Sequence, residues 1–303
     1  LNIGSMRNQG VELTAEFVPV KRENITWNIN FNIALNRNTV TSLVNDQLSL
    51  LRTISWETKF NNQYPYITQV GKPSGMMYGY VYEGTYKMDE FEGGSVLKDG
   101  IPYMSSVGKN NVRPGDPKYM DVNRDGIIDE DDQSIIGCGQ PLHTGGFGTS
   151  LNFYGFDFSV SFTYSVGGLS YDSGYAGFMG SPTSQSVGNN FHKDVFKAWS
   201  PANQNSDIPR FQFEDQYTAS ESDRFLTDAS YLNFQNAQLG YTLPEKVTRK
   251  MHINRLRFYI ACDNIIYWSC RQGFDPRFSF SGTTNSAVNS PVRTVSGGIN
   301  LTF

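Results

Sequence analysis

The sequence predicts an all-β protein in which long antiparallel strands form part of a barrel wall, with long loops at one end. Aromatic residues make up 14% of the 303-residue chain and charged residues only 18%, a composition that favours strands over helices. Several windows alternate strictly between apolar and polar side chains, and this period gives a strand one apolar and one polar face. The connections between these windows are alternately short and long.

The alternation marks about seven strands along the chain. It is clearest in five windows, residues 25–35, 147–153, 156–166, 256–262 and 295–303. Weaker alternation at 11–18 and 231–241 indicates two further strands. Helical periodicity is weak throughout, and the segment from Phe191 to Trp199 is at best one short loop helix.

Strand length favours a membrane barrel over a soluble sandwich. Strands in soluble sheets usually run about five to six residues, whereas a strand needs about 9–11 residues to cross a membrane. The windows 25–35, 156–166 and 293–303 are long enough to cross. The sequence has no apolar run of roughly 18 residues or more, which excludes a transmembrane helix.

The lengths of the connections predict an orientation. Residues 19–24 and the pair Tyr154-Gly155 form short connections, and residues 242–255 a moderate one. The segments 36–142, 167–230 and 265–292 are long. Outer-membrane barrels have short periplasmic turns and long extracellular loops, so loops 36–142 and 167–230 are expected outside the cell. The last strand would then run to the periplasmic side and close on Phe303, like the signal that the outer-membrane insertion machinery reads.

One segment, residues 121–132, has the pattern of a twelve-residue calcium loop. Gly126 stands at its sixth position, where the backbone turns sharply, and an apolar residue, Ile128, stands at its eighth. Ca²⁺ takes six to eight oxygen ligands. The expected ligands are five side chains and the carbonyl of Ile127; the side chains are those of Asp121, Asn123, Asp125, Asp129 and Asp132. Because the flanking segments do not read as paired helices, we expect a structural ion that orders the loop around 121–132.

Other kinds of site have little support in the sequence. The net charge of −4 argues against nucleic-acid binding. Cys138, Cys262 and Cys270 show no metal or redox spacing, and no catalytic motif is present, so we do not expect an enzyme. Aromatic residues of the loops could stack on sugars, although such residues more often pack within loops; they are Tyr78, Tyr80, Tyr82, Tyr86, Tyr171, Tyr175 and Trp199.

Several short motifs are spread along nearly the whole chain. The longest is the segment Gly71-Lys72-Pro73-Ser74-Gly75-Met76-Met77-Tyr78-Gly79-Tyr80. The others are Pro114-Gly115-Asp116 before the calcium-type loop, Leu239-Gly240-Tyr241-Thr242-Leu243-Pro244, Asp263-Asn264, Phe274-Asp275-Pro276, and the terminal Gly298-Ile299-Asn300-Leu301-Thr302-Phe303. Together they resemble the motifs of SusC/RagA-like TonB-dependent transporters of Bacteroidetes.

The resemblance implies that residues 1–303 are the C-terminal part of a 22-stranded outer-membrane barrel. Members of this family import oligosaccharides or peptides, driven by TonB, with a SusD-like surface lipoprotein as a lid. The chain would supply barrel wall and extracellular vestibule, in contact with outer-membrane lipid. The signal sequence, the TonB box, the plug and the first half of the barrel are not in this sequence.

Two other interpretations stay open. One is a soluble calcium-binding β-sandwich adhesin or carbohydrate-binding module, and the other is a secreted glycoside hydrolase. Neither explains the alternation of short and long connections.

Overall fold

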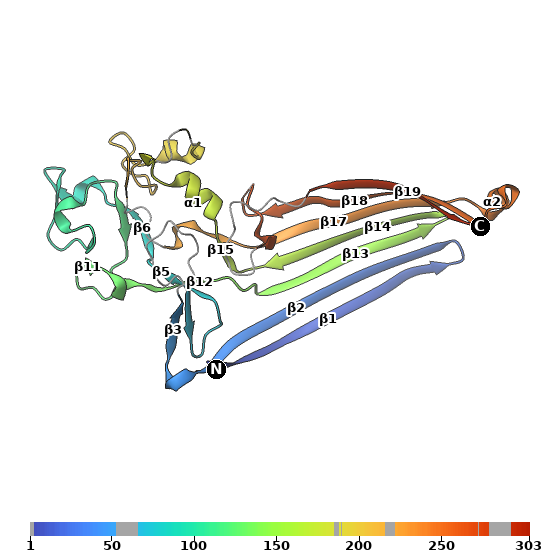
Figure 1. Ribbon diagram of the computed structural model, residues 1–303, viewed down its shortest axis with the longest axis horizontal. Coiled ribbons are helices and arrows are strands. Elements are labelled where there is room, and N and C mark those ends of the chain that lie inside the picture. Colours follow the sequence, from blue (N-terminus) through green and yellow to red (C-terminus); the bar gives the residue numbers. More distant parts are fainter. Residues whose placement is uncertain are drawn as a thin grey trace.

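The computed structural model describes residues 3–52, 66–184, 188, 190–215, 222–271, 273–278 and 292–303. Its main feature is a seven-stranded antiparallel sheet whose strands follow one another in chain order (Figure 1). The strands are β1 (Gly4–Arg22), β2 (Ile25–Leu43), β13 (His143–Phe153), β14 (Phe156–Val166), β17 (Tyr231–Thr242), β18 (Arg255–Ser269) and β19 (Thr294–Thr302). The predicted all-β, antiparallel fold class is confirmed.

The first two strands are longer than the alternation indicates. β2 continues past Leu35 to Leu43, so the first long connection begins at residue 44 and not at 36. β1 runs to Arg22, so the expected turn at 19–24 shrinks to Glu23-Asn24. A register shift between Phe17 and Val20 explains why the window 11–18 alternates only weakly, because a bulge displaces the period of two. Pro19 lies in this bulge, where a missing N–H is tolerated.

The short connections lie at one end of the sheet and the long ones at the other, as predicted (Figure 1). Tyr154 and Gly155 join β13 to β14 with φ angles of 46° and 88°, the signs that a type I′ hairpin turn requires. The turn between β17 and β18 holds α2 (Glu245–Thr248) and the 3₁₀ turn η8 (Arg249–Met251).

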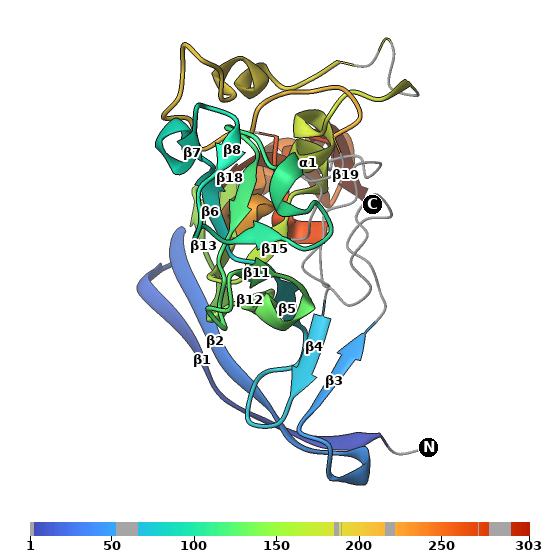
Figure 2. The same ribbon diagram turned by 90° about the vertical axis from the view of Figure 1, so that its left-hand side faces the viewer.

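The long connections 44–142 and 167–230 fold together into what we call the loop layer (Figure 2). It contains a four-stranded sheet in the order β12 (Ser134–Cys138), β5 (Met76–Gly79), β4 (Tyr66–Gln69) and β3 (Ser49–Arg52). Four strand pairs complete it: β6 (Tyr82–Thr85) with β10 (Pro117–Tyr119), β7 (Phe91–Glu92) with β8 (Val96–Leu97), β9 (Tyr103–Met104) with β11 (Ile127–Ile128), and β15 (Leu169–Tyr171) with β16 (Leu226–Asp228).

Helices in the described residues are short. The described part of the loop layer has one α-helix, α1 (Ser173–Met179), and the 3₁₀ turns η1 (Val44–Asp46), η2 (Met88–Glu90), η3 (Lys109–Asn111), η4 (Glu130–Asp132), η6 (Lys193–Lys197) and η7 (Asp223–Phe225). The turn η6 falls inside the window 191–199 where the loop helix was expected. A further turn, η9 (Pro276–Phe278), lies between β18 and β19. Among the described residues, no helix is both long and apolar enough to cross a membrane.

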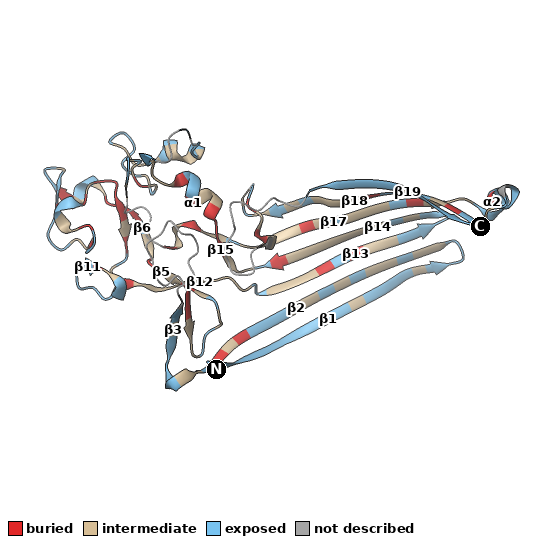
Figure 3. Ribbon diagram, in the orientation of Figure 1, coloured by how far each residue is buried: buried red, intermediate tan, exposed pale blue. Residues whose placement is uncertain are grey.

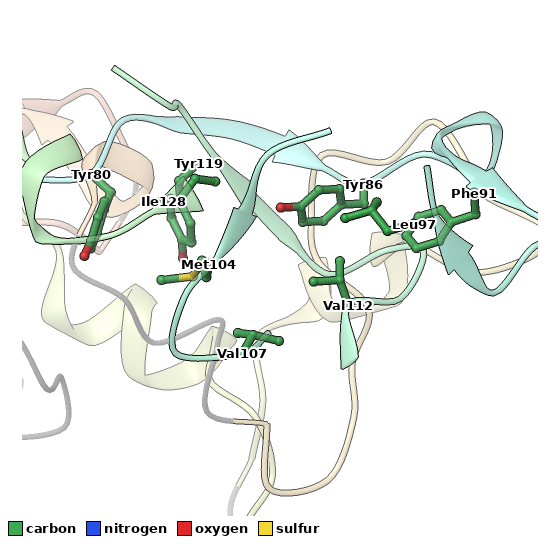
Figure 4. Close-up of a cluster of buried hydrophobic side chains, with 9 residues drawn as sticks. All are labelled: Tyr80, Tyr86, Phe91, Leu97, Met104, Val107, Val112, Tyr119 and Ile128. Atoms are coloured by element: carbon green, nitrogen blue, oxygen red, sulfur yellow. The ribbon is translucent and has the colours of Figure 1, made fainter. Parts of the chain in front are cut away.

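Most buried residues lie in the loop layer and at the adjoining ends of the strands, and a few lie further along the strands and in α2 (Figure 3). One cluster comes from the first long connection alone and consists of Tyr80, Tyr86, Phe91, Leu97, Met104, Val107, Val112, Tyr119 and Ile128 (Figure 4). The second joins Tyr66 and Met77 of the first connection to Tyr171, Ala176, Met179 and Phe225 of the second. The loop layer therefore has hydrophobic cores of its own, one of which links the two connections.

An ion pair ties together three strands on the polar face of the sheet. Arg257 of β18 donates through Nε and Nη2 to the Asp157 carboxylate of β14, at 2.8 and 2.5 Å. Gly240 of β17 lies between them, and a Cβ there would lie 2.5 Å from Arg257 Nη2. Only glycine at this position lets the two side chains meet across the middle strand.

We predict that Asp157 and Arg257 are energetically coupled. Because both side chains are largely screened from water, at 28% and 12% exposure, each single change, Asp157→Asn or Arg257→Gln, leaves its partner without a counter-charge. The double variant should lose less free energy of unfolding than the two single variants lose in total, and the difference should be about 0.5–3 kcal/mol. Urea unfolding of the reconstituted protein measures this. As a control, the losses of stability from Arg257→Gln and from Ser161→Ala, four residues after Asp157 on β14, should simply add. If the losses also add for Asp157 and Arg257, the coupling is contradicted.

Candidate functional site: the outward face and the loop layer

The strand register places the apolar residues of all seven strands on one face, which we call the outward face. One row of paired residues crosses six strands as Ala15, Phe31, Phe147, Phe162, Phe234 and Ile266. The next row crosses all seven as Phe17, Ile29, Thr149, Val160, Ala237, Cys262 and Val295. The rings of Phe147, Phe162 and Phe234 stack in series, with centroids 4.8 and 4.5 Å apart.

The outward face is exposed although it is apolar. Phe17, Ile260 and Val295 have 58%, 53% and 64% of their surface exposed. On β2 the apolar residues run from Ile25 to Leu35, which at ~3.3 Å per residue and a tilt near 45° gives a band roughly 24 Å high. That height matches the apolar band of membrane barrels, about 25 Å. The dimensions of this face therefore suit a lipid environment.

Polar groups within the band have partners on the sheet itself. The Trp27 indole N–H donates to Thr149 Oγ1 at 2.7 Å, and the Thr149 hydroxyl donates to the carbonyl of Asn28 at 2.9 Å. A hydroxyl facing hydrocarbon without a partner would cost several kcal/mol, on the order of 4–8. Aromatic residues border the band at both ends, Tyr154, Phe156 and Tyr241 at the turn end and Tyr164 and Trp268 at the loop end.

The opposite, inward face is polar and carries small side chains. Hydrogen bonds link neighbouring strands across it, from Asn28 to Ser150 at 3.3 Å and from Asn236 to Asp263 at 2.7 Å. Glu12 and Glu16 of β1 share this face with Ala34 and Asn30. A sheet with one apolar and one hydrophilic face separates two different environments.

The motif Pro114-Gly115-Asp116 joins the two long connections. Gly115 has φ +84°, and a Cβ there would lie 2.4 Å from the ring of Trp199. Arg210 donates through Nε to the buried Asp116 carboxylate at 2.6 Å, and the Arg210 N–H donates to the Gly115 carbonyl at 2.8 Å. Burial raises the pKa of Asp116, and Arg210 offsets only part of that effect. We call these contacts of Gly115 and Asp116 with Trp199 and Arg210 the loop latch.

The motif Phe274-Asp275-Pro276 anchors the third long connection against the inward face. The Arg277 side chain donates to both oxygens of Asp275 and, at 2.9 Å, to Asn233 Oδ1 of β17. Its guanidinium lies 4.6 Å from the ring centroid of Tyr267 on β18. Arg277 was not among the residues predicted from the sequence, because its hydrogen-bond partner on the sheet, Asn233, lies 44 residues away along the chain.

The twelve-residue loop 121–132 is closed by its first and last carboxylates. Asp121 accepts the backbone N–H groups of Arg124, Asp125 and Gly126 at 2.6–3.2 Å. Asp132, which is fully buried, accepts those of Val122, Asn123 and Asp129 at 2.7–3.3 Å. Gly126 has φ +87° and Arg124 φ +63°. The predicted sharp turn at Gly126 is therefore present.

The other predicted ligands lie along the same loop. Asp125 Oδ1 accepts from the Ile127 N–H at 2.8 Å, Asn123 donates to Asp125 Oδ2 at 3.0 Å, and Asp129 accepts from Asp131 at 3.0 Å. Ile128 is 1% exposed and sits in the first core cluster. Across the part of the chain that the structure describes, no three His, Cys, Asp or Glu side chains converge in a group that could hold a metal ion.

Several aromatic residues considered for sugar stacking are inside the protein. Tyr86 and Tyr171 are each 1% exposed, and Tyr80 is 9% exposed. The Tyr86 hydroxyl donates to the Pro102 carbonyl at 2.7 Å, and burial raises the pKa of this phenol. These three side chains stabilise the loop layer and are not accessible to a ligand.

Comparison with known proteins confirms the resemblance to TonB-dependent transporters. TonB-dependent receptor P3 of Formosa agariphila is 29% identical over the whole chain, and the chain covers 29% of that protein. TonB-dependent receptor SusC of Bacteroides thetaiotaomicron is 25% identical over 91% of the chain, which covers 24% of it. No model of a protein family matches the chain. Because these relatives are named as receptors, the expectation that the chain is not an enzyme is confirmed.

Solved structures show the same fold. The RagAB peptide transporter matches 99% of the chain with a TM-score of 0.75 and 21% identity, and the chain covers 29% of the transporter chain. The RagAB peptide importer in the closed-closed state matches 100% of the chain with a TM-score of 0.71. The chain thus spans less than a third of the length of the proteins it resembles.

We predict that Gly115→Ala opens the loop latch. The new methyl group meets the Trp199 ring, and an L-residue at positive φ costs a further ~1–2 kcal/mol. Hydrogen exchange at the Trp199 and Arg210 amides should become faster. Gly75→Ala is the matched control, because Gly75 has φ +76° with no atom within 4 Å of a Cβ. Equal effects of both substitutions on these two amides would show that the ring contact adds nothing.

Proposed function

We propose that this chain forms part of the barrel wall and the extracellular vestibule of an outer-membrane, TonB-dependent importer. The observation that carries the proposal is the exposed apolar band, whose height suits a bilayer, with a polar face behind it. In a soluble sandwich this apolar face would be buried against a second sheet, whereas no sheet formed by the described residues covers it, and its side chains are exposed. Within the described residues, β1 and β19 each pair with a single strand, so the sheet can continue on both sides into a closed barrel.

The substrate that fits this proposal is an oligosaccharide or a peptide. The inward face offers hydroxyl and amide groups, which bind sugars or peptide backbones by hydrogen bonds. The similarity to RagAB, which is described as a peptide transporter, supports the peptide class. Transport would consist of binding and movement without covalent chemistry. TonB would act through parts of the transporter outside residues 1–303, which would be its C-terminal part.

The loop layer is the proposed seat for a SusD-like lipoprotein. Two hydrophobic cores and the loop latch hold the two connections as one body, which suits a surface that must keep its shape when a lid binds. The loop layer would lie outside the cell, because the long connections share one end of the sheet.

A pair of neighbouring substitutions on β14 tests the membrane proposal. Val160→Arg puts a charge in the middle of the outward face and should destabilise the inserted barrel by about 2–4 kcal/mol. Ser159→Arg puts the same charge on the inward face, beside Gln238, and should assemble normally. Assembly is measured in isolated outer membranes, as the amount of full-length protein that migrates faster on a denaturing gel when the sample is left unboiled than when it is boiled. Equal assembly of both variants, or a soluble wild-type protein, would contradict the proposal.

We also propose that residues 121–132 bind a structural Ca²⁺. Hard oxygen donors suit this ion, and a carboxylate oxygen that accepts one N–H retains a lone pair for a metal. Asp121, Asn123, Asp125 and Asp132 would ligate by side chain, Ile127 by its carbonyl, and Asp129 directly or through water. The ion would offset the negative charge of a loop that is attached to the first core cluster through Ile128.

For the calcium proposal, we predict that protease cleavage within residues 110–140 depends on Ca²⁺. At a free Ca²⁺ concentration 100 times Kd, linkage stabilises the bound form by ~2.7 kcal/mol. Cleavage through local opening should then be roughly 100-fold slower than in chelator. Asp121→Ala with Asp125→Ala should abolish this difference, whereas Glu130→Gln, outside the ligand set, should keep it. Chelator-independent cleavage of the wild-type protein would rule the site out.

A further inference from the structure

The outward face of the β1–β2 hairpin changes from apolar to basic at its loop end. Val11 and Leu35 are the last apolar pair, and the next outward pairs are Gln9 with Arg37 and Arg7 with Thr39. No register shift interrupts the hairpin between Met6 and Phe17. Arg37 and Arg7 therefore stand on the same face as the apolar band, one and two pairs beyond its edge.

The inward neighbours confirm which way these arginines face. Asn38 is buried, at 7% exposure, and donates to Asn8 Oδ1 at 2.5 Å on the inward side. Ser74 of the loop layer donates to the Asn38 side chain from the same side, at 2.9 Å. Because side chains alternate along a strand, Arg7 and Arg37 point away from the loop layer, and both are exposed.

Neither arginine has a counter-charge within the described residues. No ion pair or side-chain hydrogen bond joins Arg7 or Arg37 to another described residue, whereas nine other lysine and arginine side chains are paired. Glu12 and Glu16, the acids in the middle of β1, lie on the inward face. The two positive charges thus stand diagonally across one strand pair and repel each other. An anion between them would offset this repulsion.

The position of the two charges points to a lipid headgroup. Arg37 lies two residues, or roughly 7 Å along the strand, past Leu35, which is the depth where headgroups meet the apolar band. Guanidinium groups bind phosphate through paired N–H donors. Acyl chains of the same molecule would lie over Leu35, Val11 and Leu13, so one ligand would satisfy both the charges and the apolar surface below them.

We infer that Arg7 and Arg37 bind the phosphate of an anionic lipid in the leaflet around the loop end of the barrel. The inference rests on the proposed membrane location and adds a specific lipid contact to it. Continuity with the apolar band favours a lipid over free phosphate, which would gain nothing from Leu35 or Val11.

The test compares lipid binding to the full-length protein with and without these charges. Protein in detergent micelles is mixed with equal amounts of phosphatidylglycerol and phosphatidylcholine, and retained lipid is counted by native mass spectrometry. A basic residue near an anionic surface contributes about fivefold, so Arg7→Gln with Arg37→Gln should reduce the preference for phosphatidylglycerol roughly 30-fold. Arg7→Lys with Arg37→Lys keeps the charges and should keep most of the preference.

Lys21→Gln is the matched control, because it removes a positive charge from β1 on the inward face, where Lys21 pairs with Thr26. It should leave the lipid preference unchanged. An equal preference in wild type and double glutamine variant would overturn the inference, as would complete displacement of the lipid by millimolar inorganic phosphate. If a carboxylate on a strand beside β1 already pairs with Arg7 and Arg37, the wild-type protein will likewise show no preference for phosphatidylglycerol, and the inference is overturned. Failure of the membrane proposal is distinct, because the wild-type protein would then retain neither lipid.

Discussion

The alternation of side chains, held in register across seven strands, is the constraint on which the rest of the structure depends. A slip of one residue in any strand would move its apolar set to the inward face. The sheet contains four register shifts, and two of them show how such a slip is avoided. In β17 the extra residue between Phe234 and Asn236 keeps Phe234 and Ala237 on the same face although they are three residues apart. The bulge at Pro19 does the same for Phe17 and Val20 of β1. Each bulge therefore absorbs an odd residue and preserves the outward face.

The wall could be predicted from the sequence because its determinants are local. Period-two alternation over about ten residues, and a Tyr-Gly pair between two such windows, require no knowledge of distant residues. The loop layer could not be predicted from the sequence, because its strands are mostly two to four residues long, too short to show an alternation of apolar and polar side chains. Trp199 against Gly115, Arg210 on Asp116 and Arg277 over Tyr267 are contacts between segments that only the fold brings together. The pattern of the twelve-residue loop predicted the turn at Gly126, but it holds no sign that Asp132 would be buried.

Three of the six motifs that carry the resemblance to TonB-dependent transporters attach loops to each other and to the wall, and the other three lie in or next to β17, β18 and β19. Pro114-Gly115-Asp116 forms the loop latch, and Phe274-Asp275-Pro276 precedes the arginine that fixes the third connection on β17 and β18. Gly71 and Gly75, both at positive φ, shape the turn that leads into β5 and places Ser74 on Asn38. A barrel wall tolerates many residue choices of the right polarity, whereas these joints depend on a particular glycine, carboxylate or ring.

In the proposed importer, this difference would let one wall serve many substrates. The outward face would meet only lipid and the inward face only water and polar groups, so few positions of the wall, such as Gly240 between Asp157 and Arg257, need a particular residue. The loop layer has its own cores, and its attachment to the wall is concentrated at few places, such as Asn38 with Ser74 and Asn233 with Arg277. Residues on its exposed surface can therefore change without disturbing the sheet. In the proposed importer, specificity for a substrate or a lid would then vary in the loops while the wall stays the same.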